Sequence, residues 1–120
     1  MTPAELLGYA QQLLRGLGDT TAGNSARLAA VVARQSLEAC VDDRCAAVAD
    51  SCHKASMRSR LAILKALDDR ETADRMTYLW GQLSACCHQH AYELSPTVGE
   101  VRALCEGVSD VLAGDAATSS

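Results

Sequence analysis

Apolar residues recur at steps of three and four positions along most of this chain, which is the spacing of one buried face of an α-helix. No segment alternates apolar and polar residues in the manner of a half-buried strand, and no internal repeat is present. The pattern therefore predicts an all-α protein, a single-domain bundle of about five helices. The expected helices cover approximately residues 3–17, 24–50, 57–67, 72–90 and 98–112.

The segment 76–94 carries the most distinctive side chains. It contains the only tryptophan, two of the three tyrosines, two of the three histidines and two of the six cysteines. Its apolar stripe consists of Met76, Leu79, Trp80, Leu83 and Cys87. We expect this helix and the helix that follows Thr97 to dominate the core, with Trp80 buried and the remaining helices acting as scaffold.

The second expected helix is unusually long. No glycine occurs within residues 24–80 and no proline within residues 4–95, so we expect this helix to continue through Asp42 and Asp43. Its predicted inner face is Leu28, Val31, Val32, Gln35 and Ala39. From Leu37 onward, a register of Leu37, Val41, Cys45, Val48 and Cys52 continues with helical spacing. The predicted inner face of the first helix is Leu6, Tyr9, Ala10, Leu13, Leu14 and Leu17.

Composition and capping signals support the same picture. The chain has 120 residues, enough for one core, and aromatic residues make up only 3% of it, without any phenylalanine. The core must therefore be built from aliphatic, alanine, methionine and cysteine side chains, which suits close helix packing.

The predicted helix caps are Thr2 with Glu5, Ser56, and Thr97 with Glu100. We expect a domain over residues 1–113 and a flexible polar tail over residues 114–120.

Charge and hydropathy narrow the possible environments. The net charge of −4, with both signs interspersed, argues against broad electrostatic capture of nucleic acid. No apolar run is long enough to span a bilayer, and the amino terminus lacks the features of a secretory signal. We therefore expect a cytoplasmic protein whose cysteines are thiols, with no cofactor. The Ala/Val/Cys surface of the long second helix predicts a homodimer.

His88 is the leading candidate for chemistry. On a continuous helix Ser84 and Tyr92 would lie one turn to either side of it, and Glu93 would be near. A serine, a histidine and a carboxylate can together activate a hydroxyl group, so these four are the candidate catalytic residues. There are two alternatives. These side chains could form a hydrogen-bonded polar contact between helices, or His88 could cap the end of its own helix.

A second cluster, Cys86, Cys87 and His90, offers metal-ligating side chains. Cys86 and His90 are four residues apart and Cys87 and His90 three apart, so either pair could face one ion on a helix. The paired C-x-x-C spacing of structural zinc sites is absent, however. The favoured interpretation is therefore core cysteines, with a zinc-stabilised structural protein as an alternative.

The basic residues Lys54, Arg58 and Arg60 are concentrated at the start of the third helix. Positive side chains are disfavoured at a helix amino terminus unless an anion or a carboxylate lies there. Together with Trp80, these residues form the candidate surface for an anionic or protein partner. The alternative is a solvated face whose charges pair with aspartates of this chain.

Two short strings connect the chain to known families. The string from Ala33 to Cys40, Ala-Arg-Gln-Ser-Leu-Glu-Ala-Cys, followed by a later helix that ends in histidine, resembles HEPN domains. The ending from Tyr92 to Thr97, Tyr-Glu-Leu-Ser-Pro-Thr, is similar to that of small actinobacterial helical proteins. The HEPN resemblance implies a small, often dimeric helical bundle that acts as a ribonuclease toxin or as part of a defence system.

This sequence departs from the catalytic HEPN pattern, which places an arginine shortly before a histidine. The corresponding positions hold Gly81, Gln82 and Leu83 before His88, and Leu83, Ser84 and Ala85 before His90. The resemblance therefore implies a HEPN-like module that binds a protein or RNA partner in a toxin–antitoxin or defence context, or a site completed by Arg58 or Arg60. The remaining alternative is a small enzyme that uses His88 as an acid or base in a pocket between helices.

Overall fold

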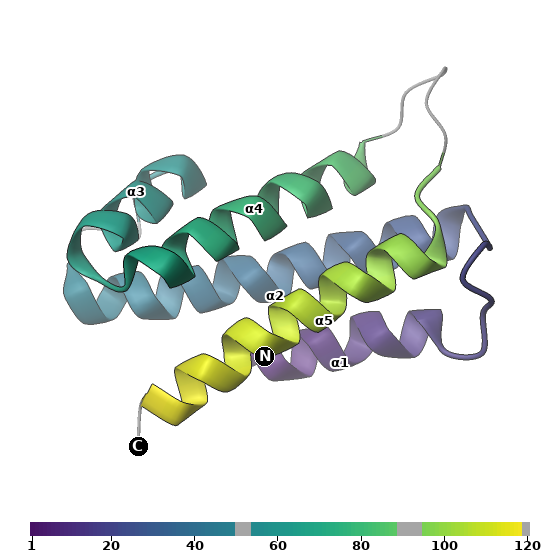
Figure 1. Cartoon of the computed structure of the whole chain (residues 1–120), viewed down its shortest axis with the longest axis horizontal. Coiled ribbons are helices and arrows are strands. Elements are labelled where there is room, and N and C mark those ends of the chain that lie inside the picture. Colours follow the sequence, from purple (N-terminus) through teal and green to yellow (C-terminus); the bar gives the residue numbers. More distant parts are fainter. Residues whose placement is uncertain (50–53, 89–94, 119–120) are drawn as a thin grey trace.

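The computed structural model describes the backbone of residues 1–49, 54–88 and 95–118, and over these ranges it consists of five α-helices (Figure 1). The helices are α1 (Pro3–Leu14), α2 (Asn24–Val48), α3 (Met57–Leu67), α4 (Arg70–Cys87) and α5 (Val98–Thr118). The prediction of an all-α bundle is therefore confirmed. None of the helices in the described ranges is both long enough and apolar enough to cross a membrane.

Helix α2 organises the bundle, because it packs against each of the other four helices. It is continuous through Asp42 and Asp43, as predicted. Its buried face consists mainly of small side chains: Ala26, Ala29, Ala30, Ala33, Ser36, Leu37, Cys40, Val41 and Cys45. Small inward side chains allow neighbouring helix axes to approach closely. The core is thus centred on α2 and not, as predicted, on α4 and α5.

Helices α1 and α2 do not bury all the residues that the periodicity indicated. Tyr9 is 50% exposed and Leu28 is 52% exposed, and Gln35 is exposed as well, whereas Leu7 is buried. The prediction gave most weight to large side chains. Helix α2 instead contacts the other helices mainly through buried alanines. Larger residues of α2 such as Leu28 therefore lie on its outer flank.

Three predicted boundaries need correction. Helix α4 begins at Arg70, earlier than predicted, because Asp69 caps it by accepting a hydrogen bond from the backbone N–H of Thr72 at 3.0 Å. It ends at Cys87, short of the predicted end. Helix α5 includes residues 114–118, which were expected to form a flexible tail. The alanines of that segment favour helix.

The predicted caps are present. Thr2 and Glu5 form a capping box at the start of α1, in which the Thr2 hydroxyl accepts from the backbone N–H of Glu5 at 3.1 Å. Ser56 caps α3 through its side chain. The backbone N–H of Glu100 donates to the Thr97 hydroxyl at 3.1 Å in the first turn of α5. These local signals therefore place three of the five helix starts correctly.

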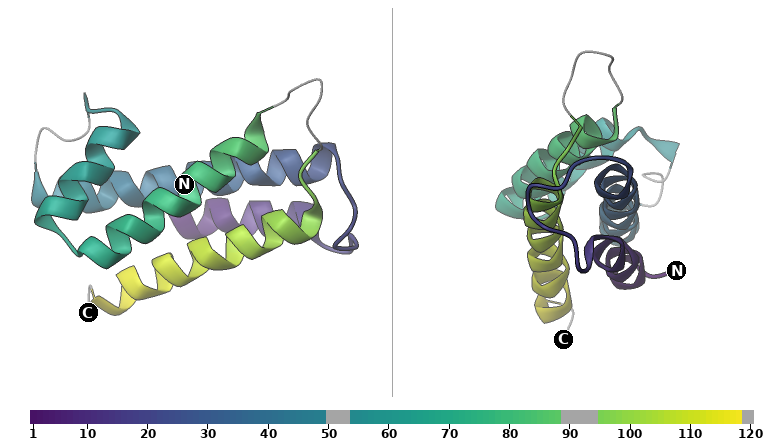
Figure 2. Two further views of the ribbon diagram at one scale, coloured as in Figure 1. Left: turned by 45° about the horizontal axis from the view of Figure 1, so that its top comes forward. Right: turned by 90° about the vertical axis from the view of Figure 1, so that its right-hand side faces the viewer.

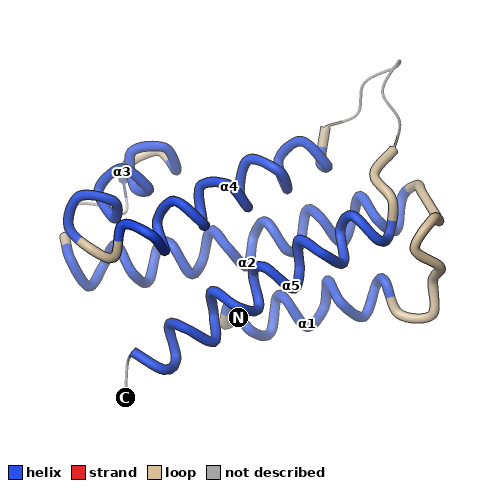
Figure 3. The backbone as a smooth tube through the Cα atoms, in the orientation of Figure 1, coloured by secondary structure: helices blue, strands red, loops and turns tan. Residues whose placement is uncertain are grey.

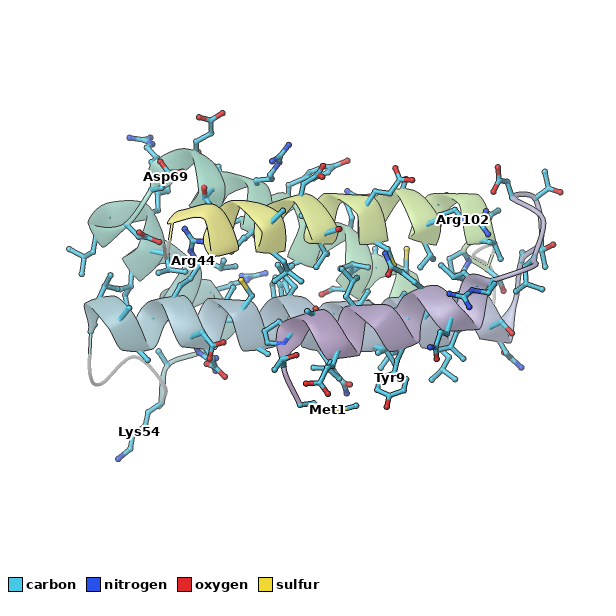
Figure 4. All side chains as sticks on the ribbon, turned by 90° about the horizontal axis from the view of Figure 1, so that it is seen from below. Met1, Tyr9, Arg44, Lys54, Asp69 and Arg102 are labelled. Atoms are coloured by element: carbon cyan, nitrogen blue, oxygen red, sulfur yellow. The ribbon has the colours of Figure 1, made fainter. Side chains whose placement is uncertain are left out.

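Arg102 on α5 fastens the carboxyl end of α1 to the bundle (Figure 4). Its Nη2 atom donates to the carbonyl oxygens of Leu14 at 3.0 Å and Leu17 at 3.1 Å, and its Nη1 atom pairs with Asp19. The Leu14 carbonyl also accepts from the backbone N–H of Leu17 at 3.2 Å, so among the described residues only the Leu17 carbonyl depends on Arg102 for a donor. The loop between α1 and α2 consequently lies beside the start of α5 (Figure 3).

We expect Arg102→Ala to lower the free energy of unfolding by about 1–3 kcal/mol, because it leaves the Leu17 carbonyl without a donor and removes one of the two donors to the Leu14 carbonyl. Urea denaturation of the two proteins measures this difference. Arg75→Ala, at an exposed arginine on α4, is the matched control and should change stability by less than about 0.5 kcal/mol. Equal losses from the two substitutions would contradict the role given to Arg102.

Candidate functional site

A groove between α3 and α4 combines charged and aromatic side chains and has a volume of about 420 Å³. Helix α3 contributes Arg58, Leu61, Ala62 and Lys65, and α4 contributes Asp74, Thr77, Trp80 and Gly81. A tight connection joins the two helices, so they form a helical hairpin beside the far end of α2 (Figures 1 and 2). Buried Leu64 and Met76 hold the hairpin against the core.

The charges of the groove are distributed unevenly. Lys65 Nζ lies 2.9 Å from Asp74 Oδ1, so these two groups neutralise each other near the connection between the helices. Arg58 lines the opposite end and makes no hydrogen bond or ion pair with any of the described residues. The first turn of α3 contains no acidic residue. One end of the groove is therefore positively charged and the other end is neutral.

The other predicted basic residues lie outside the groove. Arg60 pairs with Asp42 of α2 and donates from its Nε atom to the carbonyl oxygen of Ala55 at 2.9 Å. Its charge is thus satisfied within the chain, and the structure does not bring it together with Arg58. Lys54 is exposed and projects away from the helices (Figure 4). Of the three predicted basic residues, only Arg58 shares a surface with Trp80.

Trp80 is half-buried, contrary to the prediction that it belongs to the core. Its Nε1–H donates to Glu38 Oε1 at 3.3 Å, and the Arg34 guanidinium lies 5.7 Å from the ring centroid, within cation–π range. Arg34 Nε also donates to Glu38 Oε1 at 2.9 Å. The indole is therefore held by α2 on one side while it lines the groove on the other.

Arg34 and Glu38 are functional candidates that the sequence analysis did not single out, although both lie in the string that resembles HEPN domains. The sequence feature that could have identified them is the four-residue spacing of an arginine and a glutamate, which places both side chains on one helix face. They line a cavity of about 270 Å³ with Val31, Gln35 and Cys87. Two segments distant in sequence, the middle of α2 and the end of α4, therefore meet at this point.

The electrostatics of this cavity disfavour a reactive thiol. Burial raises the pKa of Cys87, and the neighbouring Arg34 guanidinium offsets only part of that effect. The hydrogen bond that Arg34 donates to Glu38 raises the pKa of Arg34. Burial also raises the pKa of Cys86 and brings the pKa of Cys105 to about 11. These three thiols consequently stay protonated at neutral pH and are poor nucleophiles.

The predicted catalytic set is only partly within the described residues. Ser84 is half-buried, and its hydroxyl oxygen is buried without a hydrogen-bond partner among those residues. His88 is exposed and caps the carboxyl end of α4 with an extended backbone, its N–H donating to the carbonyl oxygen of Ala85 at 3.3 Å. Because the helix ends at Cys87, the one-turn relation between Ser84 and His88 is lost. Tyr92 and Glu93 lie outside the described residues.

The predicted metal cluster is similarly incomplete. Cys86 and Cys87 are half-buried free thiols at the end of α4, and His90 lies outside the described residues. Across residues 1–49, 54–88 and 95–114, no three side chains of histidine, cysteine, aspartate or glutamate converge in a way that could hold a metal ion. The described residues therefore provide no metal site.

No protein-family model matches this chain, and neither the curated proteins nor the solved structures contain a match.

Proposed function

We propose that this chain is a HEPN-like helical module that works in the cytoplasm, in a toxin–antitoxin or defence context, and binds a partner protein through the groove between α3 and α4. The supporting observation is that Arg58, without an acidic partner among the described residues, lines the same groove as Trp80. Tryptophan and arginine are the residue types that most often dominate binding energy at protein interfaces. Arg58 and Trp80 both line this groove.

The groove suits a protein segment better than RNA. Its lining includes the apolar side chains of Leu61, Ala62 and Trp80, which an apolar surface of a partner can cover. Arg58 is its only cation that is not paired with a carboxylate, whereas binding to a phosphate backbone relies on several lysines and arginines. The net charge of −4 also opposes association with a polyanion.

The amphipathic anion 8-anilino-1-naphthalenesulfonate tests this proposal, since it combines an apolar ring system with one negative charge. Trp80 is the only tryptophan, so its fluorescence reports directly on occupancy of the groove. We expect saturable binding of the dye that quenches Trp80. Arg58→Ala should weaken this binding about tenfold, which corresponds to about 1.4 kcal/mol.

Lys54→Ala is the matched control, because Lys54 is an exposed cation outside the groove, and it should leave binding of the dye unchanged. Equal binding by the native chain and the Arg58→Ala variant, or dye saturation without a change in Trp80 fluorescence, would exclude the groove as the binding site. Displacement of the dye by a single-stranded RNA oligonucleotide would contradict the choice of a protein partner.

A second copy of the chain is the partner that we propose for a different surface, the outer flank of α1 and α2. Tyr9 points away from α5 on this flank, and the end-on view shows α1 and α2 side by side there (Figures 2 and 4). Exposed Leu28 and half-buried Leu6, Leu13 and Val32 belong to the same two helices, and we infer that they form an apolar strip with Tyr9. Two negatively charged copies can face each other across such a strip without like-charge repulsion, as a two-fold interface requires.

Sedimentation equilibrium should therefore detect a dimer at micromolar concentration. Leu28→Asp should convert it to a monomer, because the two-fold axis would bring two new carboxylates into the buried strip. Leu67→Asp, at a 62% exposed leucine on α3, should leave the dimer intact. A native chain that stays monomeric at micromolar and higher concentrations would contradict the proposed dimer.

A further inference from the structure

The partner segment that enters the groove can be specified further from the shape and charge of the groove itself. We propose that it is an amphipathic helix that carries a carboxylate at one end of its apolar ridge. This inference rests on the proposed function, since it names the kind of partner that the groove between α3 and α4 accepts. Four features of the described residues carry it.

The first feature is the direction of charge along the groove. Arg58 and Lys65 lie on the same face of α3, seven residues or about 10 Å apart. Lys65 is neutralised by Asp74, whereas Arg58 has no carboxylate partner among the described residues. A ligand therefore gains an ion pair at the Arg58 end only. This asymmetry fixes the direction in which a partner segment lies.

The second feature is Gly81, which leaves the α4 wall of the groove without a side chain. A Cβ atom added at Gly81 would meet nothing within 4 Å, so the backbone of α4 is open to close approach from outside. The distance between two packed helices depends on the side chains at their contact, and a glycine allows the shortest distances. The groove can thus receive the backbone of a partner helix as well as its side chains.

The third feature is Tyr78, which extends the binding surface beyond the groove. It is 62% exposed and lies four residues after Asp74 and three before Gly81, which places the three residues in one row on the outer side of α4. Tyr78 does not line the groove itself, so it lies on the exposed surface of α4 beside the wall that Asp74 and Gly81 form. Aromatic side chains at a rim and floor, together with an arginine, are typical of a recognition surface.

The fourth feature is size. A groove of about 420 Å³ holds a few side chains and is too small for a folded domain. The apolar ridge of a helix, at positions i, i+3, i+4 and i+7, extends over about 10 Å, which matches the separation of Arg58 and Lys65. A ridge of this length therefore fills the groove and places a residue one turn beyond it beside Arg58.

The test uses a peptide of about 18 residues, long enough to form a helix, built from alanine and glutamine with leucines at i, i+3, i+4 and i+7. It carries one glutamate, placed one turn before the first leucine. A charge-reversed peptide has lysine at that position, and a helix-broken peptide has a proline in the middle of the ridge. Binding is followed by Trp80 fluorescence and by calorimetry. We expect the parent peptide to bind at least about tenfold more tightly than either of the others.

Two variants of the chain make the result specific. Arg58→Glu should invert the preference, so that the charge-reversed peptide binds more tightly than the parent. Gly81→Leu should abolish peptide binding while the protein stays folded, because nothing lies within 4 Å of that position and leucine favours helix more than glycine does. Its unfolding curve provides the folding control.

The outcomes separate this inference from the proposed function. If the helix-broken or charge-reversed peptide binds as well as the parent while the naphthalenesulfonate dye still depends on Arg58, the helical partner is wrong and the groove remains the binding site. If neither the dye nor any peptide changes Trp80 fluorescence, both proposals fail.

Discussion

Leu37→Ala should lower the free energy of unfolding by about 2–5 kcal/mol, the largest effect expected of any single substitution considered for this chain. Leu37 is fully buried on the inward face of α2, the helix that packs against all the others. Removing most of its side chain leaves a cavity where the neighbouring helices converge, and the close alanine contacts along α2 limit how far the structure can relax. Thermal or urea denaturation measures the loss.

Leu28→Ala is the matched control, because it is the same substitution in the same helix. Leu28 is 52% exposed on the outer flank of α2, so the monomer should lose less than about 0.5 kcal/mol. The measurement is made below the concentration at which the chain self-associates, since the proposed dimer buries Leu28. Equal losses from the two substitutions would contradict the orientation of α2 that buries Leu37 and exposes Leu28.

Gly107→Val should destabilise the protein by about 1–3 kcal/mol. A Cβ atom at Gly107 in α5 would lie 2.7 Å from Leu79 Cδ2 and 3.5 Å from its Cδ1. Leu79 is itself buried, so it has little room to move away, and the added valine forces α4 and α5 apart. This cost exceeds the few tenths of a kcal/mol that valine gains over glycine in a helix.

The same substitution at Gly8 tests the explanation. Gly8 lies within α1, and a Cβ atom there would meet nothing within 4 Å. Gly8→Val should therefore be neutral or slightly stabilising in the same unfolding experiment, through helix propensity alone. A Gly107→Val protein that is as stable as the Gly8→Val protein would show that α4 and α5 do not approach closely at Gly107.

The helix plan of this protein was predictable because its determinants are local. Thr2, Ser56 and Thr97 are capping residues whose hydrogen bonds reach only three positions along the chain. The long α2 helix followed from the lack of glycine and proline within it. Asp69 was missed as a cap because several polar residues stand next to one another at that connection, and each of them could begin a helix.

The inward face of the first half of α2 was not predictable from hydropathy in the same way, whereas the predicted register of Leu37, Val41 and Cys45 is buried. Large residues such as Leu28 and Val31 dominate the apolar pattern, whereas the face that packs best here carries small residues such as Ala29 and Ala33. Which face of α2 is buried depends on how closely the other helices can approach it. This closeness is a property of the assembled bundle and not of the local sequence. Trp80 illustrates the same limit, since its periodicity indicated burial but its indole lies at an edge.

The groove was predictable in part. Arg58 and Trp80 were both candidate partner-binding residues, and the structure places them in one surface. Arg60 carries the same charge two positions later, and only its contact with Asp42, eighteen positions away in sequence, removes it from the site. Long-range ion pairs of this kind have no signature in local spacing. Whether His88 acts in binding or in catalysis stays a prediction.

The most direct test of the central claim is to map the peptide-binding surface residue by residue in solution. Backbone amide chemical shifts of the isotope-labelled chain are recorded while the parent helical peptide is added. The account predicts that the largest shift changes occur in α3 from Arg58 to Lys65 and in α4 from Asp74 to Gly81, with the Trp80 indole N–H among them. Changes confined to the outer flank of α1 and α2, or to the end of α4 around Cys87 and His88, would contradict it.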